Sequence, residues 1–89
     1  MIRRQFTVSG KVQGVWFRAG TREQALLLGL SGYAANLADG RVEVHAQGAA
    51  EAVAKLEQWL WQGPVLAKVG NIEVIEMASI PEETVFRIL

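Results

Sequence analysis

The chain contains no cysteine, and this absence excludes several classes of site. No disulfide can staple the fold, no thiolate can hold a metal ion, and no thiol can act as a nucleophile. The chain also has no excess charge of one sign, since nine Lys and Arg residues balance nine Asp and Glu residues. Because nucleic-acid-binding proteins usually carry a strongly basic face, this balance argues against a nucleic acid as partner.

Long apolar runs are also missing. No stretch of the chain approaches the roughly 18–20 apolar residues that a helix needs to cross a bilayer. The N-terminus carries Arg3 and Arg4, but neither the apolar segment nor the small-residue cleavage site of a signal peptide follows them. We therefore expect a cytoplasmic protein that has no membrane as partner.

What the chain does have is a large share of apolar residues. They make up 51% of the sequence, against 20% for charged residues, and this ratio excludes intrinsic disorder. A length of 89 residues allows one small core and no second domain. We expect residues 1–89 to form a single domain and the protein to be a monomer.

Hydrophobic periodicity predicts five strands and two helices along the chain. The first strand alternates apolar and polar residues, which is typical of a strand with one solvent-exposed face. The first helix has an apolar stripe that begins at Phe17, although Thr21 and Gln24 also fit a capping box and hence a later start. Gly29 is a natural stop for this helix. The predicted strands are residues 3–9, 33–37, 41–47, 69–77 and 84–88, and the predicted helices are residues 17–28 and 49–62.

The order of these elements is βαββαβ followed by a short terminal strand. Two βαβ halves joined by a hairpin, with its turn at Asp39-Gly40, are typical of the ferredoxin-like α+β fold, a split βαβ arrangement. We therefore expect both helices to pack on one face of an antiparallel-rich sheet. The alternation is irregular near Gly70-Asn71, which indicates a β-bulge in the strand at residues 69–77.

The segment from Gly10 to Arg18 joins the first strand to the first helix. Glycines at positions 10 and 14 allow the backbone to curl until successive N–H groups point inward, and such a nest binds anions. The following helix directs its N-terminal dipole to the same place, and the Arg18 guanidinium matches two phosphate oxygens. The alternative is that the glycines only shape a turn and Arg18 is a solvated helix residue. The local pattern alone does not decide between the two.

The residues of this segment resemble a known family. The string Val12-Gln13-Gly14-Val15-Trp16-Phe17-Arg18, followed at the proper distance by Asn36, is similar to the signature of the acylphosphatases. The similarity covers most of the chain. Further matching positions are Thr21, Leu28-Gly29-Leu30, Gly32-Tyr33, Asp39-Gly40, Val42-Glu43, Gly63-Pro64 and Phe86-Arg87-Ile88.

The resemblance implies an enzyme that hydrolyses acyl phosphates to a carboxylate and inorganic phosphate, with no cofactor and no metal. It implies that Arg18 binds the phosphate and that Asn36 orients the attacking water. Two positions depart from the common family pattern, since Leu37 stands where threonine is frequent and Ala35 where a longer polar residue is frequent. The phosphate-binding loop would consist of Gly10, Lys11, Val12, Gln13, Gly14 and Val15.

Two other functions are compatible with this fold class. One is a non-catalytic anion-binding or regulatory module, which would not need Arg18 and Asn36 together. The other is an RNA-binding module, which needs exposed aromatic residues on the central strands. We expect His45, the only histidine, to be a solvated surface residue rather than a metal ligand. The outward positions of the first and third strands hold no aromatic residue: Arg3, Gln5, Thr7, Ser9, Arg41, Glu43, His45 and Gln47.

Overall fold

The computed structural model describes residues 1–89, and it contains every element that the sequence predicts. The ends of the predicted elements differ from the observed ends by at most two residues. The elements are β1 (Ile2–Lys11), α1 (Phe17–Leu27), β2 (Ser31–Asn36), β3 (Val42–Gly48), α2 (Ala50–Gln62), β4 (Lys68–Met77) and β5 (Phe86–Ile88). Neither helix has the length and the hydropathy that crossing a membrane requires.

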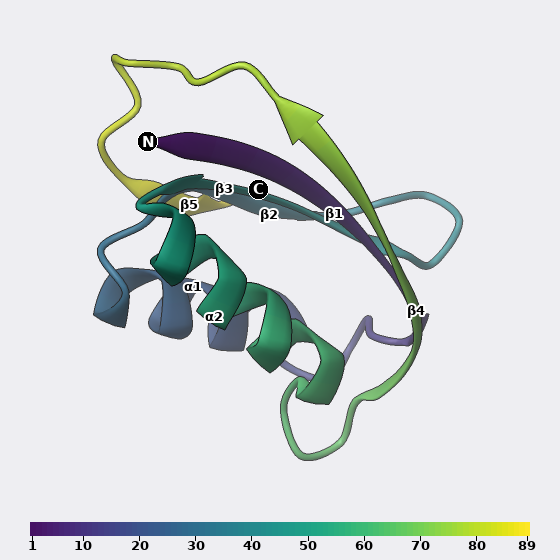
Figure 1. Cartoon of the computed structure of the whole chain (residues 1–89). Coiled ribbons are helices and arrows are strands. Elements are labelled where there is room, and N and C mark those ends of the chain that lie inside the picture. Colours follow the sequence, from purple (N-terminus) through teal and green to yellow (C-terminus); the bar gives the residue numbers. More distant parts are fainter.

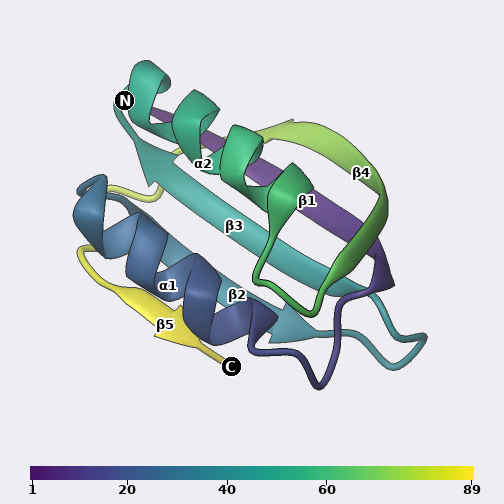
Figure 2. The same cartoon turned by 90° about the horizontal axis from the view of Figure 1, so that it is seen from below.

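The five strands form one sheet in the order β4-β1-β3-β2-β5. Neighbouring strands are antiparallel except for β2 and β5, which run parallel. Figure 1 shows both helices below the sheet, and Figure 2 shows α2 lying over β1 and α1 lying over β2 beside β5. The predicted ferredoxin-like arrangement, with two helices on one face of an antiparallel-rich sheet, is confirmed.

The core lies between the sheet and the helices and is built from sixteen buried apolar residues. The alternation of the strands directs Phe6 and Val44 inward, and the stripe of α2 directs Leu56 and Leu60 toward them. None of these four side chains is exposed to solvent. Burying an apolar side chain of this size contributes about 1.5–3 kcal/mol, so this layer is the main source of stability.

The start and the end of α1 have separate causes. The helix begins at Phe17, which is buried, and Trp16 precedes it without a side-chain cap. The alternative start at Thr21 is wrong, because Thr21 is fully buried inside the helix and its Oγ1 donates to the Phe17 carbonyl at 2.7 Å. The predicted stop is confirmed, since Gly29 follows the helix with φ +69° in the left-handed region.

A β-bulge changes the direction of the end of β1. The pairing of β1 with β4 shifts between Ser9 and Gly10, which leaves Gly70 as an extra residue of β4. This confirms the bulge predicted near Gly70. Opposite the bulge, Gly10 has φ +123°, and a Cβ at this position would lie 2.2 Å from the Lys68 carbonyl oxygen. Only glycine fits there, and the bend sets the direction in which the chain enters the next loop.

Part of the face of the sheet opposite the helices is covered, which corrects the prediction of a solvent-exposed face. On β4 this face stays open, since Glu73 and Ile75 are exposed. Residues 78–85, which we call the strap, cross this face between β4 and β5 (Figure 1). Arg3 and Gln47 are only 2% and 1% exposed, although both stand at outward positions. The prediction that His45 is a solvated surface residue is wrong as well, because it is 7% exposed.

Polar contacts hold the strap against the sheet, and they explain why polar residues are buried there. The Gln47 amide donates to the Ile80 carbonyl at 2.8 Å and accepts from the Ile80 N–H at 2.6 Å. The Arg3 guanidinium pairs with the Glu83 carboxylate and also donates to His45 Nδ1 at 3.3 Å. Arg3 and Gln47 therefore bond to the strap rather than to water.

Candidate active site

The loop between β1 and α1 makes two left-handed turns close together. Gly14 has φ +72° and Trp16 has φ +66°, and Trp16 is the only non-glycine residue of the chain with a positive φ. The side chains of Val12 and Val15 are 1% and 6% exposed, so they anchor the loop in the core. Backbone that alternates in this way gathers N–H groups on one side, which is the geometry of an anion nest.

Gln13 ties this loop to the hairpin between β2 and β3. Its Nε2 donates to the Leu37 carbonyl at 2.8 Å and to the Arg41 carbonyl at 2.9 Å. Leu37 directly follows Asn36, the last residue of β2. One side chain thus fixes the distance between the loop and the strand end that carries Asn36.

The hairpin itself is held by a local ion pair. Arg41 Nε donates to Asp39 Oδ2 at 2.7 Å, and the Arg41 backbone N–H donates to Asp39 Oδ1 at 3.2 Å. The backbone hydrogen bond and the nearby guanidinium hold the pKa of the Asp39 carboxyl below its ordinary value. The lowered pKa means that the folded hairpin favours the charged form of the Asp39 carboxylate.

Arg18 is the second residue of α1, at the end of the helix where unpaired N–H groups and the helix dipole favour anions. Its Nη1 donates to the carbonyl of Leu89, the last residue described, at 2.7 Å. No acidic side chain lies within ion-pair distance of Arg18. No side-chain carboxylate therefore neutralises the positive charge of Arg18, and the Leu89 oxygen fixes the position of one of its N–H groups.

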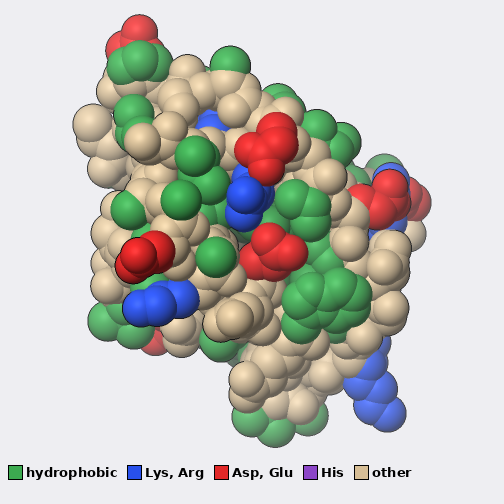
Figure 3. Space-filling view, in the orientation of Figure 1, with side chains coloured by type: hydrophobic (Ala, Val, Ile, Leu, Met, Phe, Trp, Pro, Cys, Tyr) green, Lys and Arg blue, Asp and Glu red, His purple; other side chains and the backbone are tan.

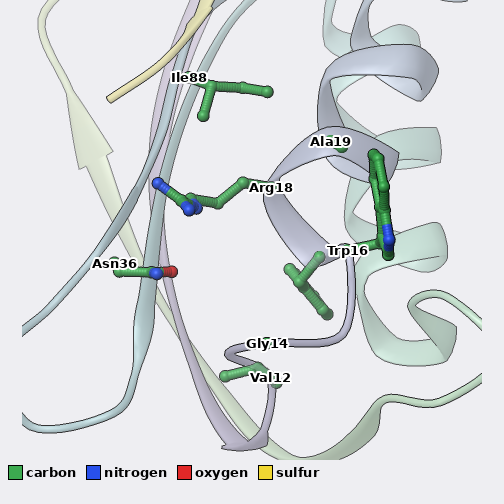
Figure 4. Close-up of a pocket in the computed structure, with 8 residues that line it drawn as sticks. Val12, Gly14, Trp16, Arg18, Ala19, Asn36 and Ile88 are labelled. Carbon is green, nitrogen blue, oxygen red and sulfur yellow. The ribbon is translucent and has the colours of Figure 1, made fainter.

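Arg18 and Asn36 face the same pocket. The pocket has a volume of about 360 Å³, and Figure 4 shows the two side chains pointing toward each other from α1 and β2, with Gly14 below them. Asn36 is exposed, so solvent reaches its amide. The lining residues are Val12, Gly14, Trp16, Phe17, Arg18, Ala19, Asn36 and Ile88.

The residues that the sequence assigns to the phosphate loop occupy different positions around this pocket. Val12 and Gly14 line it. Gly10 and Lys11 still belong to β1, where they pair with β4, and they do not line the pocket. Gln13 and Val15 do not line it either; Gln13 bonds to the hairpin and Val15 is buried.

Of the remaining four lining residues, Trp16 lies inside the motif and was expected to form a wall on the acyl side of the site, whereas Phe17, Ala19 and Ile88 were not assigned to the site. Trp16, Phe17 and Ala19 lie within or next to the glycine-rich motif, so proximity to Gly14 and Arg18 was a usable signal. Ile88 comes from β5, which follows the strap along the chain and pairs with β2 at the edge of the sheet. No local sequence pattern predicts that Ile88, near the end of the chain, lines the same pocket as Gly14.

No group of three or more His, Cys, Asp or Glu side chains gathers anywhere in residues 1–89 in a way that could hold a metal ion. The groups that the pocket offers to a ligand are therefore a guanidinium, a carboxamide, backbone N–H groups and an apolar wall. A guanidinium and oriented N–H groups suit a tetrahedral oxyanion such as phosphate. A carboxamide beside them can orient a water molecule.

Comparisons with known proteins agree with this geometry. The acylphosphatase family model matches residues 4–88. The chain is 53% identical over 81 residues to an acylphosphatase of Nitrosococcus oceani, which covers 91% of this chain and 90% of that relative. An acylphosphatase structure from Bacillus subtilis has a TM-score of 0.96 and 34% identity, covering 100% of this chain and 99% of that one. An acylphosphatase structure from Coxiella burnetii has a TM-score of 0.94 and 40% identity, and the match covers 99% of this chain and 92% of that one.

These relatives match nearly the whole chain rather than one motif, and the solved structures share its fold. The chain therefore belongs to the acylphosphatase family.

Proposed function

We propose that this protein hydrolyses the carboxyl-phosphate bond of acyl phosphates, with Arg18 and the loop from Gly10 to Val15 binding the phosphoryl group and Asn36 orienting the attacking water. The observation that carries this proposal is the position of Arg18 and Asn36 on facing walls of one pocket above Gly14 (Figure 4). A small acyl phosphate is the substrate, and a carboxylate and inorganic phosphate are the products. The relatives named above as acylphosphatases support the same reaction.

Binding of the phosphoryl group rests on three sources of positive potential. The nest at Gly14 and Trp16 supplies N–H groups, the start of α1 supplies its dipole, and Arg18 supplies a full charge. Because Arg18 Nη1 is held by the Leu89 carbonyl, the remaining guanidinium donors are preoriented for two phosphoryl oxygens. Preorganised donors of this kind stabilise a transition state without reorganisation at the moment of reaction.

The chemistry of an acyl phosphate explains why these groups suffice. The leaving group is a carboxylate, which is stable at neutral pH and needs no general acid. Phosphoryl transfer passes through a loose transition state, so positioning and charge stabilisation dominate. The Asn36 amide is too weak a base to remove a proton, but it can hold water in line with the leaving oxygen. In this mechanism the bound phosphoryl group itself accepts the proton of the water.

The two rival functions are less well supported. An anion-binding module of the same fold would need Arg18 but has no use for an exposed carboxamide facing it. An RNA-binding module would use the face of the sheet that the strap covers, where Arg3, His45 and Gln47 are buried. Acidic and basic side chains are also interspersed on the face shown in Figure 3, with no broad basic patch. No nucleic acid is therefore part of this proposal.

A hydrolysis assay tests the proposal directly. Purified protein should hydrolyse benzoyl phosphate, and Arg18→Lys should lose at least about 10²-fold in kcat/KM because the planar fork is lost. Arg22→Lys, on the exposed side of the same helix, is the matched control and should retain full activity. Asn36→Ala should lower kcat far more than it changes KM. A near-native Arg18→Lys enzyme, or an Asn36→Ala effect confined to KM, would contradict the assigned roles.

The absence of a metal or cofactor is part of the proposal, and EDTA tests it. Hydrolysis should persist after exhaustive treatment with the chelator, and complete loss that is restored by a divalent cation would show that the mechanism is wrong. We further propose that residues 1–89 act as one domain, as a monomer and in the cytoplasm. These three points rest on the composition of the chain, and gel filtration tests the second.

A further inference from the structure

Trp16 occupies a position that the stability of the fold does not explain. Its side chain is 79% exposed, and its backbone has φ +66°, a conformation that glycine adopts without strain. For a bulky residue this conformation costs about 1–2 kcal/mol. Trp59, by contrast, packs on Phe17 with its ring centroid 6.0 Å from the phenyl ring. A tryptophan that is both strained and exposed gains little from the core, so its contacts with a ligand are the remaining explanation.

The pocket is larger than a phosphoryl group requires. Its volume is about 360 Å³. One water molecule occupies about 30 Å³ in the liquid, so a phosphoryl group, with one phosphorus and three oxygen atoms, fills only part of the pocket. The polar groups, Arg18 and Asn36, gather on one side. Of the apolar lining residues, Val12 and Phe17 are almost completely buried and Ile88 is 40% exposed, whereas Trp16, at 79%, offers the largest free surface.

The direction of the reaction relates Trp16 to the acyl group. In an in-line displacement the attacking water and the leaving oxygen lie on opposite sides of phosphorus. If Asn36 holds the water, the acyl group must leave on the side away from Asn36. Figure 4 shows Trp16 on the helix side of the pocket beside Ala19, across from Asn36 and beyond Arg18. The leaving acyl group therefore points toward the indole.

We propose that Trp16 is a specificity-determining residue that contacts the acyl group and favours acyl phosphates with an aromatic or extended apolar acyl part over those with a small one. This inference rests on the proposed function, since it takes the attacking water from Asn36. An indole face provides apolar area and an aromatic surface on which a benzoyl ring can stack. Neither gain is available to an acetyl group, which is too small to reach across the pocket.

The experiment compares two substrates in four proteins: wild type, Trp16→Ala, Trp16→Phe and Trp61→Ala. Trp61 is 48% exposed on α2 and does not line the pocket, so it is a matched control for loss of an indole. In Trp16→Ala, kcat/KM for benzoyl phosphate should fall about tenfold more than kcat/KM for acetyl phosphate, the size of one good aromatic contact. Trp16→Phe should keep most of the preference, and Trp61→Ala all of it.

Inhibition by inorganic phosphate separates specificity from loop structure. Because phosphate has no acyl part, its inhibition constant should change no more than kcat/KM for acetyl phosphate does. Equal losses for both substrates would overturn the inference and make Trp16 a structural residue of the loop. An unchanged substrate ratio in Trp16→Ala would overturn it too. The proposed function fails separately, if wild type hydrolyses neither substrate or if Arg18→Lys hydrolyses acetyl phosphate normally.

Discussion

The helices cover one face of the sheet and the strap covers part of the other, and the two coverings make opposite kinds of contact. On the helix face, side chains such as Phe6 and Leu56 are fully buried and form an apolar layer. On the other face, Arg3, His45 and Gln47 are equally shielded from water, yet all three are polar. The same strands thus present an apolar layer to the helices and a polar layer to the strap.

The difference follows from what covers each face. A helix satisfies its own backbone N–H and C=O groups, so the sheet needs to offer it only apolar surface. The strap is irregular, and its backbone groups need partners outside the strap. The Gln47 side chain bonds to both backbone groups of Ile80, and the N–H of Gly32 donates to the Val85 carbonyl at 3.0 Å. Buried polar side chains on this face therefore supply hydrogen-bond partners that the strap needs and a helix does not.

The largest effect should come from the apolar face. Leu56→Ala removes a fully buried side chain of α2 and should lower the free energy of unfolding by about 2–5 kcal/mol, since it loses apolar burial and leaves a cavity. Leu27→Ala makes the same change on α1 at a side chain that is 81% exposed, and it should stay within about 0.5 kcal/mol of wild type. Urea denaturation measures both. Equal losses would mean that burial does not distinguish the two positions.

The polar face should respond less to truncation, and in a way that apolar replacement can reverse. Arg3→Met leaves Glu83 and His45 without their guanidinium partner and should cost about 1–3 kcal/mol. Arg3→Met combined with Glu83→Leu should recover much of this loss, because replacing both members of a buried pair by apolar residues is often close to neutral.

The double substitution decides what the buried charges on this face contribute. Arg22→Met, at an exposed position of α1, is the control for loss of one positive charge and should leave unfolding unchanged. If the double variant is as unstable as the sum of the two single variants, the ion pair is not the relevant interaction. If Arg3→Met alone is harmless, the comparison between the two faces is wrong for this residue.

This comparison also shows which parts of the fold the sequence could predict. Periodicity within β1 and β3 identified which residues face the helices, because burial on that side depends only on local alternation. The same alternation predicted a solvent-exposed second face, and that was wrong. Whether Arg3 meets water or Glu83 depends on a contact between residues eighty positions apart, which no local pattern contains.

The pocket divides in the same way. Arg18, Asn36 and Gly14 belong to a recognisable motif, and their shared pocket agrees with the expectation drawn from it. Ile88 reaches the pocket only because the strap carries β5 to the edge of β2. Lys11, which the motif assigns to the phosphate loop, is the last residue of β1, because β1 runs two residues further than its alternation indicated.

The strap connects the polar face to the site, and Gln47 tests this link. Gln47→Leu leaves both backbone groups of Ile80 without their partner and should cost about 1–2 kcal/mol, the net value of two hydrogen bonds. Since the strap leads to Ile88 and to the Leu89 carbonyl that holds Arg18, kcat/KM for acyl phosphates should also fall, by about two- to fivefold.

Gln58→Leu is the control for this substitution, because Gln58 lies exposed on α2 and far from the strap in sequence. It should alter neither stability nor activity. A loss of stability in Gln47→Leu with unchanged kcat/KM would show that β5 keeps its place without the strap. In that case the polar face would support the fold but not the site.

The smallest expected effect is a change in the pKa of Tyr33, the one tyrosine of the chain. This pKa tests whether the polar face is shielded from water and charged. The Tyr33 ring stacks on His45 with centroids 4.4 Å apart, and burial, followed by the negative charge of Glu43, raises the pKa of its phenol above the ordinary value. The folded pKa then lies above the unfolded one of about 10. The contribution of Tyr33 to stability is complete below this pH and is lost as pH rises through the folded pKa.

Phenolate absorbance reports the titration, since Tyr33 is the only tyrosine. The midpoint should be higher in the folded protein than in urea, and Glu43→Gln should bring it partly back. An identical midpoint in both states would mean that this side of the sheet is open to water at Tyr33.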